Sequence, residues 1–154
     1  MIKFKEGAAY LKSVFITLFI CILIMLIMTF WSAVANIQSF KSSARTVLDA
    51  YVSEKSIKIF NEIKDSKDNI ISFSSDDYNQ RLVSFCGFTD SGGHFEKLNP
   101  DLIYSVSIPS LTVDNSELNM KMECTVTVPL YFCGVQISNA VAPISINSSF
   151  EDIF

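Results

Sequence analysis

The chain of 154 residues has room for one domain, and its formal net charge is −4. Residues 1–12 carry a net charge of +2, which leaves −6 for the remainder; the charged residues of this basic head are Lys3, Lys5, Glu6 and Lys12. An acidic remainder is unsuited to holding a phosphate backbone, so the composition excludes nucleic-acid binding.

An uncharged apolar run follows the basic head. Residues 14–35, about 22 residues, would rise roughly 33 Å as a helix, which matches a hydrocarbon core of about 30 Å. Trp31, near the outer end, suits the membrane interface. We therefore expect a transmembrane helix over residues 13–36, with the lipid bilayer as a partner. Because short Lys-rich flanks resist translocation, residues 1–12 should be cytoplasmic and the C-terminal domain extracytoplasmic, in a single-pass protein of the cell membrane.

A cleaved signal peptide is the alternative interpretation of this run. Ala33, Val34 and Ala35 satisfy the small-x-small pattern, and cleavage after Ala35 would release the rest of the chain. The apolar region of a signal peptide usually has only about 7–15 residues, so the length of the run favours a permanent anchor.

Helical periodicity continues beyond the apolar run. No Gly or Pro lies between the end of this run and the DSKDN cluster at residues 65–69. Apolar residues recur at spacings of three and four, at Ile37, Phe40, Ala44, Val47, Leu48, Tyr51, Val52, Ile59, Phe60 and Ile63. One helix over residues 8–64 is expected, with residues 37–64 as its extracytoplasmic continuation. Two helices with a bend near Asn36 and Ser39 are the alternative.

Residues 65–154 change to a period of two and predict an antiparallel β domain. Apolar residues alternate with polar ones over residues 118–128 and 102–108, and residues 114–117 have turn chemistry, so these two runs should form a hairpin. Leu111 and Val113 are apolar at odd positions, whereas the preceding apolar residues are at even positions. We expect a bulge or bend at Pro109 and Ser110 to reset the face.

Further strands are expected at residues 70–73, 81–88, 131–137 and 143–150, and residues 89–101 are expected to form an exposed loop. The predicted fold class is α+β: a long N-terminal transmembrane and amphipathic helix packed on a small antiparallel sheet of four or five strands. The apolar stripe of the helix and the apolar face of the sheet would cover each other.

Four stretches carry a family resemblance over nearly the whole chain: KEGAAYL before the apolar run, FKSSARTVLDAYVSEKSIKIF after it, ECTVTVPLYFCG, and the closing APISINSSFEDIF. With this organisation, the chain resembles the TadE-like minor pilins, or pseudopilins, of tight-adherence (Tad, Flp-type) pilus systems and their Gram-positive relatives. The resemblance implies a pilin-like fold, a structural role in assembly of a Tad or type IV-like pilus or secretion apparatus, and other pilin-like or pilus-assembly subunits as partners.

The sequence departs from the processed pilins at one place. Prepilin peptidases cut after a Gly, for which Gly7 is the candidate, and many processed pilins carry a Glu five residues later. Lys12 stands at that distance here, and Glu6 precedes Gly7. An uncleaved accessory subunit retained in the membrane fits these residues better than a polymerising pilin.

The sequence does not predict an enzyme, a cofactor or a small-molecule substrate. The fragment from Asp90 to Gly93 is similar to the nucleophile loop of trypsin-like proteases, but Thr89 stands where that motif has Gly. His94 lies in the same segment, whereas a catalytic triad needs a base from a distant segment.

Neither the cysteines nor the acidic pairs predict a metal site. Cys21 lies in the apolar run, and the spacing of Cys86, Cys124 and Cys133 differs from that of zinc ligands. A disulfide from Cys133 to Cys124 or to Cys86, or three buried free thiols, are the open alternatives. The acidic pairs lack the spacing and the Gly of a calcium loop; they are Asp65 with Asp68 and Asp76 with Asp77.

Two functions remain open at this point. The first is a structural accessory subunit that packs against partner helices where its own helix leaves the lipid. Its contact candidates are Phe30, Trp31, Ile37 and Phe40, which lipid or the sheet of the same chain could cover equally well. The alternative is a membrane-tethered or secreted ligand-binding or adhesin domain, released by signal peptidase after Ala35, that recognises a ligand with its sheet or with residues 89–101.

Overall fold

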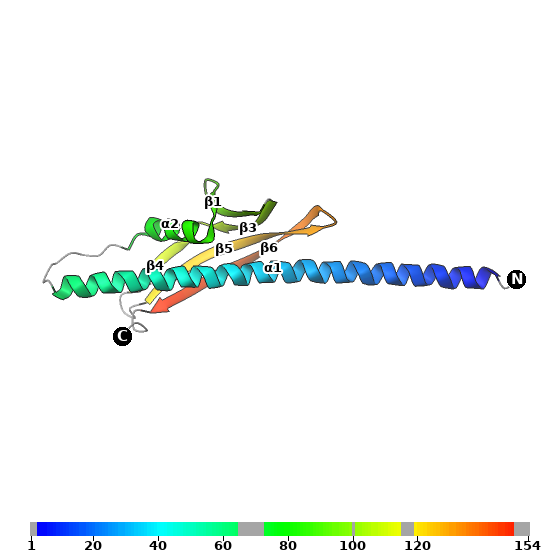
Figure 1. The fold of residues 1–154 in the computed structure, drawn as a ribbon, viewed down its shortest axis with the longest axis horizontal. Coiled ribbons are helices and arrows are strands. Elements are labelled where there is room, and N and C mark those ends of the chain that lie inside the picture. The colour runs from blue at the N-terminus through cyan, green and yellow to red at the C-terminus, as the bar shows by residue number, and fades with distance from the viewer. Residues whose placement is uncertain (1–2, 65–72, 100, 115–118, 150–154) are drawn as a thin grey trace.

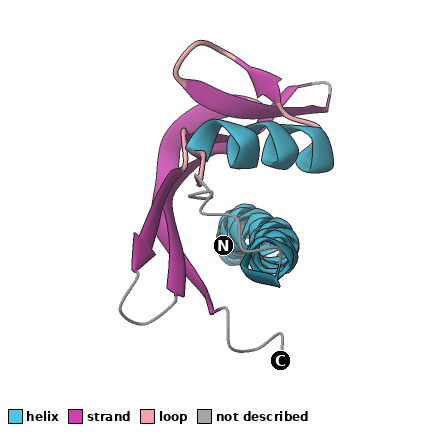
Figure 2. Ribbon diagram, turned by 90° about the vertical axis from the view of Figure 1, so that its left-hand side faces the viewer, coloured by secondary structure: helices cyan, strands magenta, loops and turns pink. Residues whose placement is uncertain are grey.

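The computed structural model describes residues 3–64, 73–99, 101–114 and 119–149. Within them lie two helices, α1 (Lys3–Lys64) and α2 (Ser75–Cys86), and an antiparallel sheet of six strands. α1 runs along the whole length of the molecule, while the sheet and α2 lie beside its C-terminal part (Figure 1). Both helices lie on the concave side of the curled sheet (Figure 2). The predicted α+β class, with a long helix packed on an antiparallel sheet, is confirmed.

α1 is one helix of 62 residues, and it continues through Asn36 and Ser39 without a break. Its buried face begins at Ala33 and follows the helical repeat through Phe40, Ala44, Val47, Leu48, Tyr51 and Val52. Residues 10–32 are exposed except for Thr29, which is partly covered. The prediction of one continuous helix is confirmed. Ile59, Phe60 and Ile63 of the predicted stripe lie where the structure describes the backbone alone.

The sheet is organised around its two longest strands. Its strands are β1 (Thr89–Asp90), β2 (His94–Asn99), β3 (Asp101–Ser107), β4 (Ser110–Asp114), β5 (Asn119–Phe132) and β6 (Val135–Ser149). β6 pairs with β5 along the full length of β5. β3 and β4 pair with successive segments of the other edge of β5, and β2 and β1 extend the sheet beyond β3. The sheet has more strands than the predicted four or five because β1 and β2 were expected to be loop.

A bulge separates β3 from β4. Val106 pairs with Val126, whereas Ser110 pairs with Glu123, so β3 and β4 hold one residue more than the segment of β5 that they face. Val106 is buried before the bulge, and Pro109 is buried after it. The extra residue thus moves the buried face from even to odd positions, as predicted from Leu111 and Val113, which pack partly buried against the core.

The predicted strand at residues 81–88 is wrong, because most of that segment belongs to α2. The Ser74 hydroxyl accepts a hydrogen bond from the Asp77 N–H and caps the helix N-terminus. At the other end Gly87 adopts φ +63°, and the N–H groups of Gly87 and Phe88 both donate to the carbonyl of Val83. These caps favour a helix over the strand that the local run of apolar residues suggested.

The predicted loop at residues 89–101 is also wrong. β1 and β2 form a hairpin, and the Ser91 N–H donates to the His94 carbonyl across a turn of residues 91–93. Gly92 and Gly93 take positive φ angles of 71° and 143° in this turn. Only Phe95 is buried within these two strands, so their sequence lacks the alternation that marks a half-buried strand.

The remaining predicted strands match in part. Residues 131–137 contain a two-residue turn between β5 and β6, and residues 143–149 lie within β6. Phe73 belongs to no strand, and residues 70–72 lie outside the described residues, as do residues 115–117 of the predicted turn and Leu118.

The core joins α1, the end of α2 and the sheet through an aromatic cluster. The ring centroid of Phe40 lies 6.0 Å from that of Phe88 and 6.1 Å from that of Tyr104, and Phe88 lies 6.2 Å from Phe95. Further along α1, Tyr51 and Tyr78 meet edge to face at 5.9 Å. These rings place α2 and the sheet against one face of α1, beginning where the exposed apolar segment ends.

Candidate membrane and assembly surfaces

The N-terminal half of α1 presents apolar side chains all round the helix. Described residues 10–32 of α1 have no buried side chain, although most are apolar. The best window of this helix has a mean hydropathy of 2.8 and lies near the N-terminus. α1 is therefore long and apolar enough to cross a membrane.

The four predicted contact residues divide into two groups at the end of this apolar segment. Phe30 and Trp31 are exposed, Trp31 by 72%. Ile37 packs partly buried against the core, and Phe40 is fully buried at 0% exposure. The assignment of Phe40 as a contact residue is wrong, because Phe40 lies on the face of α1 that the sheet covers. Phe30 and Trp31 remain free to contact lipid or another helix.

A charged cluster fastens α2 to α1. The Arg81 guanidinium bonds Glu54 of α1 through Nη1 at 2.5 Å and Asp77 of α2 through Nε at 3.2 Å. Lys58 pairs with Glu54 at 2.7 Å, and Lys55 pairs with Asp77 at 3.6 Å. Arg81 and Glu54 are 27 positions apart in the sequence, so this cluster is a tertiary contact between two helices.

The cationic groups of this cluster also stack on an aromatic ring. Lys55 Nζ lies 5.2 Å and the Arg81 guanidinium carbon 5.3 Å from the ring centroid of Tyr51. Hydrogen bonds from Arg81, and then from Lys58, lower the pKa of Glu54 to about 2. Glu54 is therefore ionised at neutral pH, where it pairs with Arg81 and Lys58.

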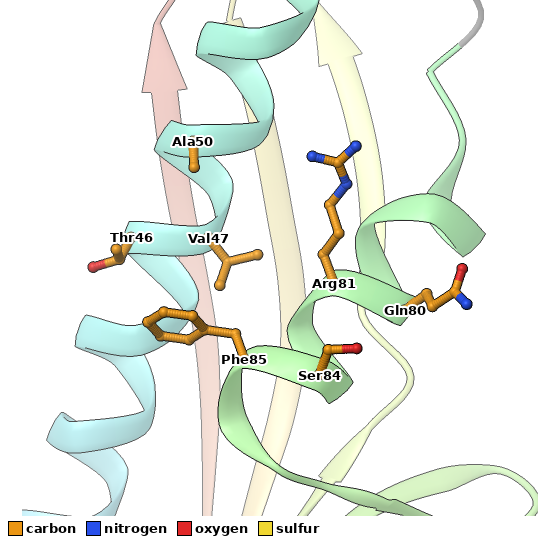
Figure 3. Close-up of a pocket in the computed structure, with 7 residues that line it drawn as sticks. All are labelled: Thr46, Val47, Ala50, Gln80, Arg81, Ser84 and Phe85. Carbon is orange, nitrogen blue, oxygen red and sulfur yellow. The ribbon is translucent and has the colours of Figure 1, made fainter.

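A shallow groove runs beside the charged cluster, between α1 and α2 (Figure 3). It has a volume of about 570 Å³ and is lined by Thr46, Val47, Ala50, Gln80, Arg81, Ser84 and Phe85. Phe85 is exposed and lies across the groove towards α1 (Figure 3). Arg81 is the one charged lining residue and is engaged by Glu54 and Asp77. The groove offers an apolar contact surface without a catalytic group.

The β1–β2 hairpin holds a small polar cluster around Glu96. Its carboxylate accepts a hydrogen bond from the Ser91 hydroxyl at 2.8 Å and lies 2.9 Å from His94 Nε2. These two contacts hold the pKa of Glu96 below its usual value. Ser91 and His94 thus both bond the carboxylate between them, which differs from the order of a catalytic triad, in which the histidine stands between hydroxyl and carboxylate.

The three cysteines after the apolar segment are free thiols in three different surroundings. Cys124 is buried on β5, as its strand position predicted, and burial raises its pKa to about 12. Cys133 is exposed in the turn that follows β5, nine positions further along, which is roughly 30 Å in an extended strand. The predicted Cys124–Cys133 disulfide does not fit this geometry. Cys86 is partly buried, and its pairing with Cys133 stays a prediction.

The remaining predicted positions lie on α1 or near α2. Gly7 and Ala35 are both within α1, and processing at either residue stays a prediction. Asp77 pairs with Lys55 and Arg81, Asp76 is exposed, and Asp65 and Asp68 lie outside the described residues. Where side chains are described, no group of three or more His, Cys, Asp or Glu is close enough to hold a metal ion.

Sequence reasoning missed the residues that seat α2. The Tyr78 hydroxyl donates to the Ala44 carbonyl at 3.3 Å, and the Tyr51 hydroxyl donates to the Ser74 carbonyl at 3.2 Å. Burial raises the pKa of Tyr78 above its usual value. The signal that could have found α2 was the cap pair of Ser74 and Gly87, with Tyr78 and Leu82 four residues apart between them.

Comparison of the chain with protein-family models, with curated proteins and with solved structures gave no match.

Proposed function

We propose that the chain is a single-pass membrane protein with a structural, non-enzymatic function. The N-terminal half of α1 lies in the cell membrane with residues 1–12 in the cytoplasm, and the C-terminal half is the spine of an extracytoplasmic β body. In this role the protein is an accessory, minor pilin-like subunit that takes part in assembling a Tad or type IV-like pilus or a related secretion apparatus. It needs no cofactor, small-molecule substrate or nucleic acid.

One observation carries the proposal: the two halves of a single helix have opposite surroundings. From Ala33 onward one face of α1 is covered by the sheet and α2, whereas residues 10–32 expose apolar side chains on every face. Water would oppose such exposure at roughly 25 cal/mol per Å² of apolar area. A bilayer removes this cost and leaves the body outside the lipid, tied to it by an unbroken helix.

The assembly role is supported by the side chains at the end of the apolar segment. Phe30 and Trp31 are large, exposed and free of contacts with the sheet core, so they are available to a neighbouring helix. The basic head, the apolar run and the helical continuation have the arrangement of the minor pilins that the chain resembles.

Site-specific crosslinking in intact cells tests the assembly role. A photoreactive residue replaces Trp31 in one variant and Asn147, exposed on β6, in a matched control. We expect the position of Trp31 to crosslink to other membrane proteins with apolar helices, and the position of Asn147 to give far less of these products. If the residue at position 31 gives no protein adduct and the native chain leaves gently solubilised membranes alone, the assembly role is refuted.

Ligand recognition by the body is the second candidate function, and the groove between α1 and α2 favours it. The groove combines an apolar lining with the exposed ring of Phe85. Mass spectrometry of the mature N-terminus separates the two functions. A terminus at Asn36 means release by signal peptidase and favours a secreted binding domain, one at Ala8 means pilin-type processing, and an intact Met1 means a permanent anchor.

A further inference from the structure

The β5–β6 hairpin extends along α1 beyond the rest of the sheet, towards the N-terminal half of the helix (Figure 1). The Thr29 hydroxyl, which donates a hydrogen bond to the Met25 carbonyl at 2.9 Å, also lies 3.4 Å from the Tyr131 carbonyl. A shared groove shows the same proximity, with Met28, Thr29, Ser32 and Ala33 from α1 facing Val128, Pro129 and Tyr131 from β5. The tip of the hairpin is thus level with residues that belong to the apolar segment.

The level of this contact can be placed against a bilayer. Thr29 precedes Ala35, the end of the apolar run, by six residues, or roughly 9 Å of helix. The run itself is roughly 33 Å long, against a hydrocarbon core of about 30 Å. A membrane centred on the run therefore has its outer hydrocarbon boundary roughly 7 Å above Thr29. At that level the hairpin reaches past the headgroup boundary, roughly 7 Å into the outer acyl chains.

The exposed side chains of the hairpin change from charged to apolar towards its tip, as a tip that enters the bilayer requires. Residues 124–150 contain no Asp, Glu, Lys, Arg or His. Near the tip the exposed side chains are apolar, with Val135 exposed by 66%, Ile137 by 54% and Val141 by 62%. At the opposite end of β5 the exposed side chains are Lys121 and Glu123. The charged end lies away from the apolar half of α1, and the apolar end lies beside it.

The backbone of the tip also suits an environment poor in water. Phe132 pairs with Val135 across a turn of two residues, in which Cys133 and Gly134 have φ angles of 50° and 78°. Such a tight turn leaves few backbone groups of the turn itself without partners. Among the described residues, β5 beyond Thr127 pairs with β6 alone, so its other edge needs partners from headgroups or water, which limits the depth of the tip. Gln136 and Asn139, which bond each other at 2.6 Å, keep polar groups just behind the tip. This combination fits shallow insertion rather than a position in the hydrocarbon centre.

We propose that residues 131–137 pass the headgroup boundary and insert into the outer acyl-chain region of the bilayer that α1 spans. The proposal rests on the proposed membrane anchoring of α1. Lipid is the partner because the apolar tip is continuous with the apolar surface of α1 at the same level, and because residues 124–150 carry no charge that would attract a charged protein surface. The body is then held at the membrane at two points, the helix and the hairpin tip.

Depth-dependent fluorescence quenching tests the proposal on the full chain in vesicles of phosphatidylcholine and phosphatidylglycerol. An environment-sensitive label is attached in detergent to Cys133 of a Cys21→Ala variant, and the protein is then reconstituted. Cys86 is partly buried and Cys124 is buried, so labelling should favour Cys133. The matched control carries Cys133→Ser and Ser145→Cys, which places the label on the exposed polar end of β6.

We expect lipids with a nitroxide high on the acyl chain to quench the label on Cys133 several-fold more than the label at position 145, and aqueous iodide to show the reverse order. Ile137→Asp should move the Cys133 label towards iodide access, whereas Asn147→Asp, on the same strand, should not. Equal iodide quenching of the two labels overturns the proposal. The same result is expected if a protein partner, and not lipid, covers the tip in cells, because that partner is absent from the vesicles.

Fluorescence quenching of Trp31 distinguishes failure of the hairpin insertion from failure of the membrane anchor. Trp31 is the single tryptophan of the chain and lies two residues after Thr29 on α1. Quenching of Trp31 by the same nitroxide lipids, without quenching of the Cys133 label, refutes the hairpin insertion alone. Absence of Trp31 quenching by those lipids refutes the membrane position of α1, and with it both proposals.

Discussion

The two halves of α1 have the same backbone and different surfaces. Residues 10–32 show apolar side chains around the whole helix, whereas from Ala33 the apolar side chains form a stripe under the sheet and charged residues such as Arg45 and Glu54 occupy other positions. A stripe indicates a helix that meets protein on one face and water on the other. A uniformly apolar surface indicates one solvent on all sides. The difference locates the change of environment at Ala33.

Core truncation should give the largest difference between the halves. Phe40→Ala removes the ring that meets Phe88 and Tyr104, and we expect the β body to lose about 3–5 kcal/mol of its free energy of unfolding. Phe19→Ala, in the exposed apolar half, should leave the unfolding of the body nearly unchanged. Denaturant titration followed by circular dichroism in lipid nanodiscs measures both variants. Equal losses for the two variants would mean that the halves share one environment.

A single added charge should be tolerated in the outer half of α1 and opposed in the apolar half. Ile24→Lys places an ammonium group in the middle of the exposed apolar half, where insertion into lipid is opposed by about 2.5–3.5 kcal/mol. Ala50→Lys places the same group on an exposed position of the outer half and should be tolerated. The fraction of each variant that resists alkaline extraction from membranes measures the effect. Unchanged membrane retention of Ile24→Lys, with the native orientation, would contradict the lipid position of this half.

The stability of the body around the outer half of α1 should also depend on α2, which packs against it. Gly87→Ala places a side chain at φ +63°, a left-handed conformation that disfavours residues with a Cβ by roughly 1–2 kcal/mol. The new Cβ would also lie 3.4 Å from Lys97 Nζ, which can move away. We expect a small drop in the melting temperature of the body. Ser84→Ala, on the exposed face of α2, is the matched control, and an equal drop in both variants would contradict the role of the cap.

Acid should weaken the link between α2 and the outer half by a smaller amount. Bonds from Arg81 lower the pKa of Glu54 from 4.5 to about 2, so the stabilisation is complete above pH 4.5 and is lost as the pH falls towards 2. The difference in melting temperature between the native chain and Glu54→Gln should therefore shrink over this range. For Ser84→Ala, which removes no ionisable group, the difference from the native chain should stay constant over the same range. A constant difference for Glu54→Gln would contradict the Arg81 contact.

The features that could be predicted from the sequence are those with a long, regular pattern. α1 joins a long uncharged run to a helical repeat that begins at Ala33, β5 alternates clearly enough to predict its buried face, and the odd positions of Leu111 and Val113 predict the bulge. α2 was missed because its 12 residues contain neighbouring apolar residues, such as Leu82 and Val83, that also fit a short strand. β1 and β2 were missed because both faces are largely exposed, which removes the alternation.

The candidate surfaces were predictable only where one segment forms them alone. Trp31 could be placed at the end of the apolar run from its position in the sequence. The contact between Arg81 and Glu54, and the position of the β5–β6 tip beside Thr29, join segments far apart in the chain. Such contacts depend on how the sheet curls over α1, which a local pattern does not contain.

The continuity of α1 has a mechanical consequence. A helix without a hinge transmits rotation, so a tilt that membrane thickness imposes on one end swings the other end by the same angle. Because the sheet is packed against the outer turns of α1, the body would move with the helix as one rigid unit. A force on the body, for example from an extending filament, would reach the bilayer as torque, because α1 has no flexible joint that could absorb it.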